Sequence, residues 1–229
     1  MIVFKNVSKS YKQAGRESIA LDKVSFKIQP NEFVSIVGRS GAGKSTIIRL
    51  LVGEEKPSEG RVFFGSYEVD KLKPNELPDF RRNIGVVFQD FRLLSQKTAF
   101  ENIAFVLEVE GYAQNEINKI VPKVLELVGM DDKMTKFPAE LSGGEKQRIA
   151  IARAMINKPE VIIADEPTGN LDPMNKWEVV KLLNKINELG STIILATHDK
   201  EIVNNLGQRV ITLEGGKLIK DEANGKFVL

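Results

Sequence analysis

One short stretch, residues 34–46, constrains what this chain can fold into more than any other. Its sequence is VSIVGRSGAGKST, an apolar run followed by three glycines and then by a segment with helical periodicity. Gly38, Gly43, Lys44 and Ser45 occupy the fixed positions of the phosphate-loop pattern G-x-x-x-x-G-K-[ST]. The stretch therefore predicts a buried strand, a glycine-rich turn and the first turn of a helix.

Each residue type in this pattern serves the binding of phosphate. Glycines lack a Cβ, so backbone N–H groups can close around phosphate oxygens. We expect the Lys44 ammonium between the β- and γ-phosphates and the Ser45 hydroxyl on Mg²⁺. The helix expected over residues 45–52, with Gly53 at its C-terminal end, directs its positive end at the anion. The alternative, a turn that merely joins strand to helix, is disfavoured by the apolar strand before it and the helical pattern after it.

Length and composition limit the class of protein. With 229 residues the chain can form one substantial domain, and a net charge of +2 gives no indication of nucleic acid as a partner. The absence of cysteine excludes disulfides and thiolate zinc sites. The start is charged too early for a signal peptide, and no apolar run approaches the ~20 residues of a membrane span. We therefore expect a cytosolic protein that reaches a membrane only through a partner.

The first third of the chain has the alternating pattern of strands. Residues 2–7, 24–28 and 61–64 are predicted strands, and residues 81–88 are expected to end in a short buried strand. The polar residues 9–22 are a predicted linker, and residues 70–78 a loop or short helix. Tyr11 either stacks on a nucleobase or packs in the core. Gln89, directly after a core strand, either reaches a metal or its water or is a turn residue.

Residues 91–157 are predicted to form an inserted helical subdomain. Residues 98–108 and 115–128 are amphipathic, and Pro122 is expected to kink or split the second helix. The sequence Leu141-Ser142-Gly143-Gly144-Glu145 precedes a further helix that ends at Ile156. Ser142 suits the N-cap, and the two glycines leave the first amides of the helix unobstructed, which predicts a second anion site.

The apolar run over residues 161–166 ends in Asp165 and Glu166, which is typical of a parallel strand buried on both faces. Ligands gather at the carboxyl ends of such strands. One acid can hold hydrated Mg²⁺ while its neighbour, on the other face of the pleat, polarises water. The alternative is that these acids are simple helix caps.

The last part of the chain predicts a helix over residues 177–189 that Gly190 stops, a buried strand over 192–196 and a closing hairpin. Thr197, His198 and Asp199 follow this strand and are therefore expected at the same sheet edge as Asp165 and Glu166. His198 is the only histidine, and at this place we favour contact with a γ-phosphate over a structural role. The tail from Lys220 is polar and expected to fray.

These elements occur in one order: the phosphate loop, Gln89, the segment 141–145, Asp165-Glu166 and His198. This arrangement resembles the ATP-binding cassette (ABC) ATPases over nearly the whole chain, and the Leu-Ser-Gly-Gly element is its most specific part. The resemblance implies an α/β phosphate-loop NTPase core with a mixed, mostly parallel sheet. It also implies an N-terminal antiparallel β subdomain and a helical subdomain inserted at about residues 91–157, all within a single nucleotide-binding domain, residues 1–229.

The resemblance assigns roles to individual residues. The expected catalytic residues are Glu166 as general base, His198 at the γ-phosphate, Lys44 and Gln89; the expected Mg²⁺ ligands are Ser45, Gln89 and Asp165. The residues expected to hold ATP, with Tyr11 on the adenine, are Tyr11, Gly38, Arg39, Ser40, Gly41, Ala42, Gly43, Lys44, Ser45, Thr46, Ser142, Gly143, Gly144 and Asp172. Ser142 and Gly144 would contact ATP held by an opposite subunit, with Asp172 in the loop that crosses the interface of an ATP-dependent homodimer.

The segment 88–94, FQDFRLL, in a chain without a C-terminal regulatory domain, resembles the branch of the family that acts in bacterial cell division. That branch implies an integral membrane partner bound through the region after Gln89, a place on the cytoplasmic face of the membrane and regulation of cell-wall hydrolases. No nucleic-acid partner is expected.

Two alternatives remain open. The segment 167–172, PTGNLD, also suits the ATPases of lipoprotein release and macrolide export. A different class would be an ATP-dependent structural dimer with little turnover, against which Asp165, Glu166 and His198 favour hydrolysis. Cassette proteins of DNA repair or translation are disfavoured, because they carry long insertions or two cassettes in one chain.

Overall fold

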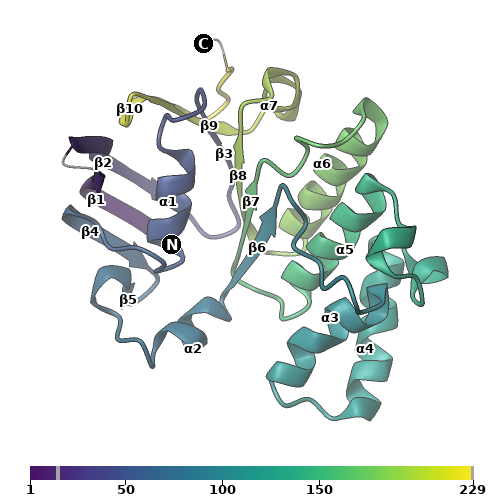
Figure 1. Cartoon of the computed structure of the whole chain (residues 1–229). Coiled ribbons are helices and arrows are strands. Elements are labelled where there is room, and N and C mark those ends of the chain that lie inside the picture. The colour runs from purple at the N-terminus through teal and green to yellow at the C-terminus, as the bar shows by residue number, and fades with distance from the viewer. Residues whose placement is uncertain (14–15, 228–229) are drawn as a thin grey trace. The chain divides into compact units, whose positions relative to one another are not determined.

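The computed structural model describes residues 1–13 and 16–227, and Figure 1 labels its helices and strands. The chain divides into two compact units. Unit 1 comprises Met1–Arg81 and Thr192–Leu229, and unit 2 comprises Arg82–Ser191.

An antiparallel sheet forms the N-terminal part of unit 1. It contains β1 (Ile2–Gln13), β2 (Arg16–Ile28), β4 (Glu59–Phe64) and β5 (Tyr67–Glu68), in the order β2-β1-β4-β5. The prediction of a polar linker over residues 9–22 is wrong, because β1 and β2 stay paired along it, with Tyr11 opposite Ser18. Backbone pairing holds this ribbon although its side chains are mostly polar. Residues 14–15 lie outside the described part of the chain.

A second group of strands in unit 1 is mainly parallel. β3 (Phe33–Val37) pairs in parallel with β8 (Thr192–Thr197) on one side and β9 (Arg209–Glu214) on the other, and β10 (Lys217–Glu222) is antiparallel to β9. Every residue of β3 and β8 is buried, which explains their apolar runs without alternation. The helices of unit 1 are α1 (Lys44–Leu51), α2 (Leu77–Arg81) and α7 (Lys200–Leu206), with a 3-10 turn at Val69–Lys71.

The C-terminal tail is docked onto unit 1 near α7 (Figure 1). Phe227 is only 3% exposed and belongs to an apolar cluster with Val37, Val203 and Val210. Its backbone N–H donates to Asn204 Oδ1 at 2.8 Å. The expectation that the tail from Lys220 frays is therefore wrong up to residue 227, and residues 228–229 lie outside the described part.

Unit 2 contains two parallel strands and most of the helices. β6 (Ile84–Phe88) pairs with β7 (Val161–Asp165). The helices are α3 (Ala99–Val109), α4 (Gln114–Leu127), α5 (Gly143–Met155) and α6 (Pro173–Glu188), with 3-10 turns at Asp131–Lys133 and Pro138–Glu140. α3 and α4 lie within one residue of the predicted helices, whereas α6 begins at Pro173, four residues before the predicted start at residue 177.

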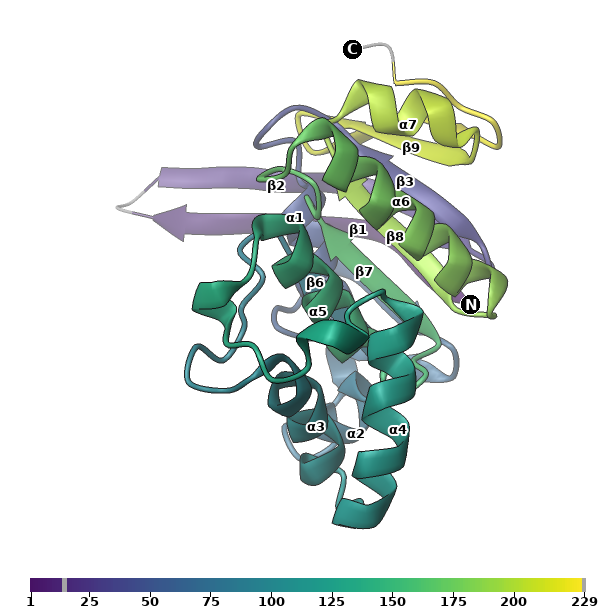
Figure 2. The ribbon, with the colours of Figure 1, turned by 90° about the vertical axis from the view of Figure 1, so that its right-hand side faces the viewer.

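The helices of unit 2 bury the apolar faces that their sequences predict. α3 packs against both α4 and α5 (Figure 2). Ile103 and Leu107 of α3 and Ile117, Val121 and Leu125 of α4 are buried. α4 continues through Pro122, so the proline does not split it.

The α/β fold class, with its mostly parallel strands and its N-terminal antiparallel sheet, is confirmed. None of the helices in residues 1–13 and 16–227 has both the length and the apolar character of a membrane span.

Candidate functional site

The phosphate loop connects β3 to α1, as the sequence predicts. Lys44 is the first residue of α1, and its side chain lies back along the loop. Its Nζ donates to the carbonyl of Gly38 at 2.8 Å and to that of Arg39 at 3.4 Å. The lysine is only 8% exposed, so the ammonium is held at the loop rather than extended into water.

Two glycines allow this loop to pack closely on its neighbours. A Cβ on Gly38 would overlap the carbonyl oxygen of Leu213 on β9. Gly43 has φ = 108°, and a Cβ there would lie 2.7 Å from both Ala20 O and Leu21 Cδ2 on β2. The loop backbone is therefore fixed between two strands, which gives a preorganised row of amides for phosphate oxygens.

His198 lies at the same sheet edge as the phosphate loop. Thr197 of β8 is directly opposite Val37 of β3, so His198 and Gly38 are the next residues on two paired parallel strands. The side chain of His198 is exposed. This placement agrees with a role at the phosphates, although the role itself stays a prediction.

Tyr11 lies in β1 and is half-buried. The Nζ of Lys9 is 5.2 Å from the centroid of its ring, and the same ammonium pairs with Glu55 at 3.1 Å. Stacking of adenine on Tyr11 stays a prediction.

Unit 2 brings Gln89, Asp165 and Glu166 together. Phe88 is opposite Asp165 in the parallel pair β6–β7, so Gln89 and Glu166 are the next residues on neighbouring strands. Glu166 has φ = 47°, a left-handed conformation that glutamate rarely adopts. Its carbonyl accepts a hydrogen bond from the N–H of Gly169 at 3.1 Å, which closes a turn after the strand. This local strain at a strand end is typical of functional residues.

The side chain of Gln89 is oriented by Asn170. Its Nε2 donates to Asn170 Oδ1 at 3.3 Å, and Asn170 Nδ2 donates to the Gln89 carbonyl at 3.3 Å. The side-chain nitrogen of Gln89 is thereby used as a donor, and the expected role of its side-chain oxygen as a metal ligand stays a prediction.

The expected donor set fits Mg²⁺. Ser45, Gln89 and Asp165 offer a hydroxyl, an amide oxygen and a carboxylate, the hard oxygen ligands that this ion prefers. Among the described residues, no group of three or more His, Cys, Asp or Glu side chains is arranged to hold a metal ion.

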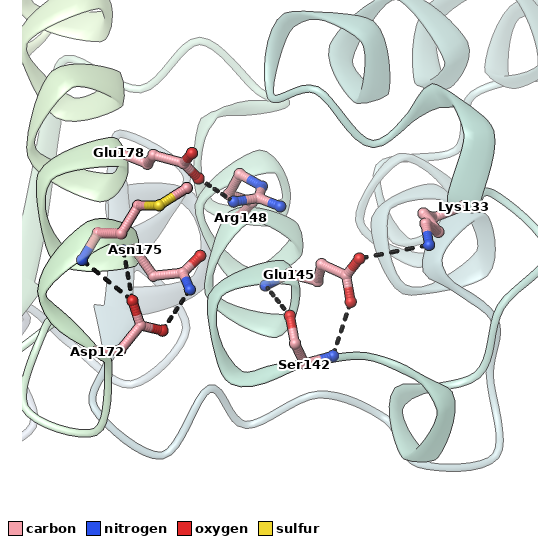
Figure 3. Close-up of polar contacts among 8 residues, drawn as sticks. Lys133, Ser142, Glu145, Arg148, Asp172, Asn175 and Glu178 are labelled. Carbon is pink, nitrogen blue, oxygen red and sulfur yellow. Dashed lines mark hydrogen bonds and ion pairs between the residues drawn. The ribbon is translucent and has the colours of Figure 1, made fainter.

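The start of α5 has the predicted cap. Glu145 N–H donates to Ser142 Oγ at 3.3 Å, and Ser142 N–H donates to Glu145 Oε2 at 2.7 Å, a reciprocal capping box (Figure 3). Lys133 pairs with the same carboxylate at 3.5 Å. The hydrogen bond from the Ser142 backbone holds the pKa of Glu145 below its usual value. The first amides of α5 thus keep a fixed direction.

The start of α6 lies directly beside the start of α5 (Figure 3). Asp172 caps α6, accepting from Met174 N–H and Asn175 N–H at 3.1 Å each. The Asn175 side chain donates to the same carboxylate and is the main cause that lowers the pKa of Asp172. That side chain also lies against Gly144, so unit 2 brings Ser142, Gly144 and Asp172 together, while their roles at ATP stay predictions.

Sequence reasoning missed the two asparagines that orient this half of the site. Asn175 stands three residues after the N-cap Asp172, a spacing that places it in the first turn of a helix and that could have indicated a cap partner. No comparable local signal marks Asn170, because its partner Gln89 is distant in the chain.

Known proteins resemble this chain over nearly its whole length. A family model described as "ABC transporter" matches residues 21–169. The chain is 50% identical over 227 residues to the "Cell division ATP-binding protein FtsE" of Bacillus subtilis, covering 99% of this chain and 98% of the relative. The protein of the same name from Mycobacterium tuberculosis is 49% identical with the same coverage, and that of Escherichia coli is 44% identical over 218 residues, 95% of this chain and 97% of the relative.

Two solved structures have similar folds. The dimeric ATP-binding cassette MJ0796 in a post-hydrolysis state bound to ADP and Pi has a TM-score of 0.89 at 37% identity, covering 99% of this chain and all (100%) of that one. A second dimeric structure of MJ0796, described as a bacterial ABC transporter cassette, has a TM-score of 0.89 at 38% identity with the same coverage.

Proposed function

Because this chain belongs to the ABC transporter family, we propose that it is the ATP-hydrolysing subunit of a membrane complex that acts in bacterial cell division. The division role is supported by identities of 44–50% over at least 95% of the chain to proteins named cell division ATP-binding protein FtsE. These identities favour cell division over lipoprotein release and macrolide export.

The observation that carries the enzymatic part is the pairing of β6 with β7. It sets Gln89 and Glu166 side by side directly after Phe88 and Asp165, at the strand ends where ligands of such sheets bind. Unit 1 contributes the phosphate loop with Lys44, Ser45 and His198. ATP would take contacts from both sets of residues.

The reaction is the attack of water on the γ-phosphate. Glu166 would take the proton of the attacking water, while Lys44 and His198 stabilise charge on the γ-phosphate oxygens. Mg²⁺, held by Ser45, Gln89 and Asp165, would neutralise charge on the β- and γ-phosphates. Because Glu166 and Gln89 directly follow paired strands, the pairing holds them near one another before substrate arrives, which favours catalysis through positioning.

Two copies would close head to tail over two ATP molecules. The starts of α5 and α6 carry the residues for this contact, Ser142, Gly143, Gly144 and Asp172, and they already lie together in one copy. The amides at the start of α5 would meet the γ-phosphate of ATP held by the other copy. Closure then depends on that phosphate and reverses after hydrolysis.

The segment Phe91–Leu94 would bind an integral membrane partner of the FtsX type, which places the chain on the cytoplasmic face of the membrane. Leu94 is 38% exposed and Leu93 is half-buried, so apolar side chains of this segment are available to a partner.

A set of three variants tests the enzymatic part. With purified protein, Glu166→Gln should bind ATP, form a stable dimer and lose about 10²–10⁴-fold in kcat. Lys44→Ala should lose ATP binding. Glu160→Gln, which removes an exposed carboxylate just before β7, should keep wild-type turnover. Near-normal hydrolysis by Glu166→Gln would remove Glu166 from the role of base.

Crosslinking tests the partner. A photoreactive residue at Leu93 should capture, in native membranes, a protein with few spans and a large extracytoplasmic loop. Capture of a lipoprotein-release permease or an exporter would leave the ATPase chemistry intact and refute the division role. A matched label at exposed Lys119 on α4 should capture neither.

A further inference from the structure

Arg153 of α5 holds the backbone of the segment after Gln89. Its Nη1 donates to the carbonyl of Arg92 at 2.6 Å and its Nη2 to the carbonyl of Phe91 at 3.0 Å. The planar guanidinium thus bridges two consecutive carbonyls, a geometry that lysine cannot reproduce. Arg153 is half-buried, which strengthens these charge-assisted hydrogen bonds.

The two residues held in this way have an uncommon backbone. Phe91 and Arg92 have φ = 58° and 47°, so both lie in the left-handed region. Such conformations persist only where the surroundings enforce them. The Arg92 guanidinium adds a second contact, with its Cζ 3.7 Å from the centroid of the Phe88 ring at the end of β6. The segment is therefore a strained turn kept in place by Arg153.

A fully buried asparagine fixes the other end of the segment. Asn102 of α3 accepts from Leu94 N–H at 2.8 Å and donates to the carbonyls of Leu94, Lys97 and Thr98 at 3.1, 2.9 and 2.9 Å. Side chains of Arg153 and Asn102 therefore hydrogen-bond to the backbones of Phe91, Arg92 and Leu94. Among the described residues 91–94, only Leu93 has no such bond to its backbone. A displacement of α5 would therefore reach the segment through the carbonyls of Phe91 and Arg92.

The other end of α5 is the proposed contact with the γ-phosphate. Gly143 begins α5 and Arg153 follows ten residues later, about 15 Å along the helix axis. α5 thus has a proposed ATP contact at its start. About three turns later, its Arg153 holds the segment Phe91–Leu94, which is proposed to bind the membrane partner.

We propose that Arg153 is a positioning residue that transmits the state of the Ser142–Gly144 end of α5 to the segment Phe91–Leu94. The inference rests on the proposed function, since that function supplies the ATP contact and the membrane partner. Arg153 touches neither ATP nor the reacting atoms. Its removal leaves ATP binding intact and uncouples the segment from the nucleotide.

Amide hydrogen exchange of the full chain, with and without Mg²⁺ and ATP, tests this in a Glu166→Gln background that retains ATP. Arg153→Lys keeps the positive charge but loses the planar pair of N–H donors. In this variant, the amides of residues 90–97 should exchange about tenfold faster, or more, than in Glu166→Gln alone. Their protection by ATP should be lost, while ATP still protects residues 38–46 and 142–145. Arg153→Gln should give the same result and serves if the lysine variant does not fold.

Arg148→Lys is the matched control. Arg148 lies on the same helix and pairs with the Glu178 side chain at 2.6 Å, away from the segment 90–97, so this variant should exchange like the parent. Unchanged exchange at residues 90–97 in both Arg153 variants, or a persistent response of that segment to ATP, would overturn the inference. The inference would also be overturned if, in Glu166→Gln alone, ATP slowed exchange at residues 38–46 but left exchange at residues 90–97 unchanged. No response to ATP anywhere would instead refute the proposed function.

Discussion

The side chain of Asn175 occupies the space that a side chain on Gly144 would need. A Cβ built on Gly144 overlaps the Asn175 amide, and the same amide donates to the Asp172 carboxylate that caps α6. The packing of α5 on α6 within one copy of the chain therefore requires glycine at position 144 of the Leu-Ser-Gly-Gly element, independently of any ligand.

Gly144→Ala should destabilise the protein for this reason. The added methyl displaces Asn175 and weakens the α6 cap, which we expect to lower the free energy of unfolding by about 2 kcal/mol and Tm by roughly 4–8 °C. Urea and thermal unfolding measure this. Gly143→Ala is the control, because its Cβ would come no closer than 3.4 Å to Leu171 Cδ2. Equal losses in the two variants would show that the Asn175 contact is not the cause.

The capping carboxylates predict a dependence of stability on pH. Hydrogen bonding holds the pKa of Glu145 below its usual 4.5 and that of Asp172 below its usual 3.8. A carboxyl with a lowered folded pKa stabilises the fold above its unfolded pKa, and this contribution is lost as the pH falls through the folded pKa. The free energy of unfolding should therefore decline as the pH drops below about 4.5.

Glu145→Gln isolates the part of this decline that belongs to the α5 cap. The variant should be less stable than wild type at pH 7, and the difference should shrink as the pH falls through the lowered pKa of the folded Glu145 carboxyl. Urea midpoints at several pH values test this. A difference that stays constant over the whole range would mean that the charge of Glu145 does not contribute.

Phe227→Ala should destabilise unit 1. The ring is buried against Val37, Val203 and Val210, and removing it from such a cluster typically costs about 3 kcal/mol. Lys226→Ala, one residue earlier and exposed, should leave the unfolding midpoint unchanged. If the two variants unfold alike, the docked tail contributes no stability.

Much of the fold could be predicted because its signals are local. The apolar runs of β3, β7 and β8 predict fully buried strands, and Ser142 predicts a helix start that the capping box confirms. The pairing of β1 with β2 beyond residue 9 could not be predicted, since it depends on backbone hydrogen bonds and not on a side-chain pattern. Among tail residues 220–227 of the described chain, Phe227 is the one large apolar anchor, and α7 with seven residues is too short for periodicity.

Some features of the candidate site also have local signals in the sequence, and others do not. Asp165 ends a strand, and Gln89, Glu166 and His198 each follow one, so the sequence predicts their sheet edge. The strand register places neighbours within each unit next to one another there. Contacts between residues far apart in the chain are not predictable from one sequence. Gly144 with Asn175, and Arg153 with the carbonyls of Phe91 and Arg92, are of this kind.

The position of β3 has a consequence for the synthesis of the protein. β3 spans Phe33–Val37, yet its two strand partners are Thr192–Thr197 and Arg209–Glu214, and Phe227 closes the cluster around Val37. A ribosome therefore releases the strand that leads to the phosphate loop long before either neighbour exists. This apolar strand must be kept from wrong pairings until residues 192–227 have been synthesised, so the packing around the phosphate loop is completed late although the loop itself is made early.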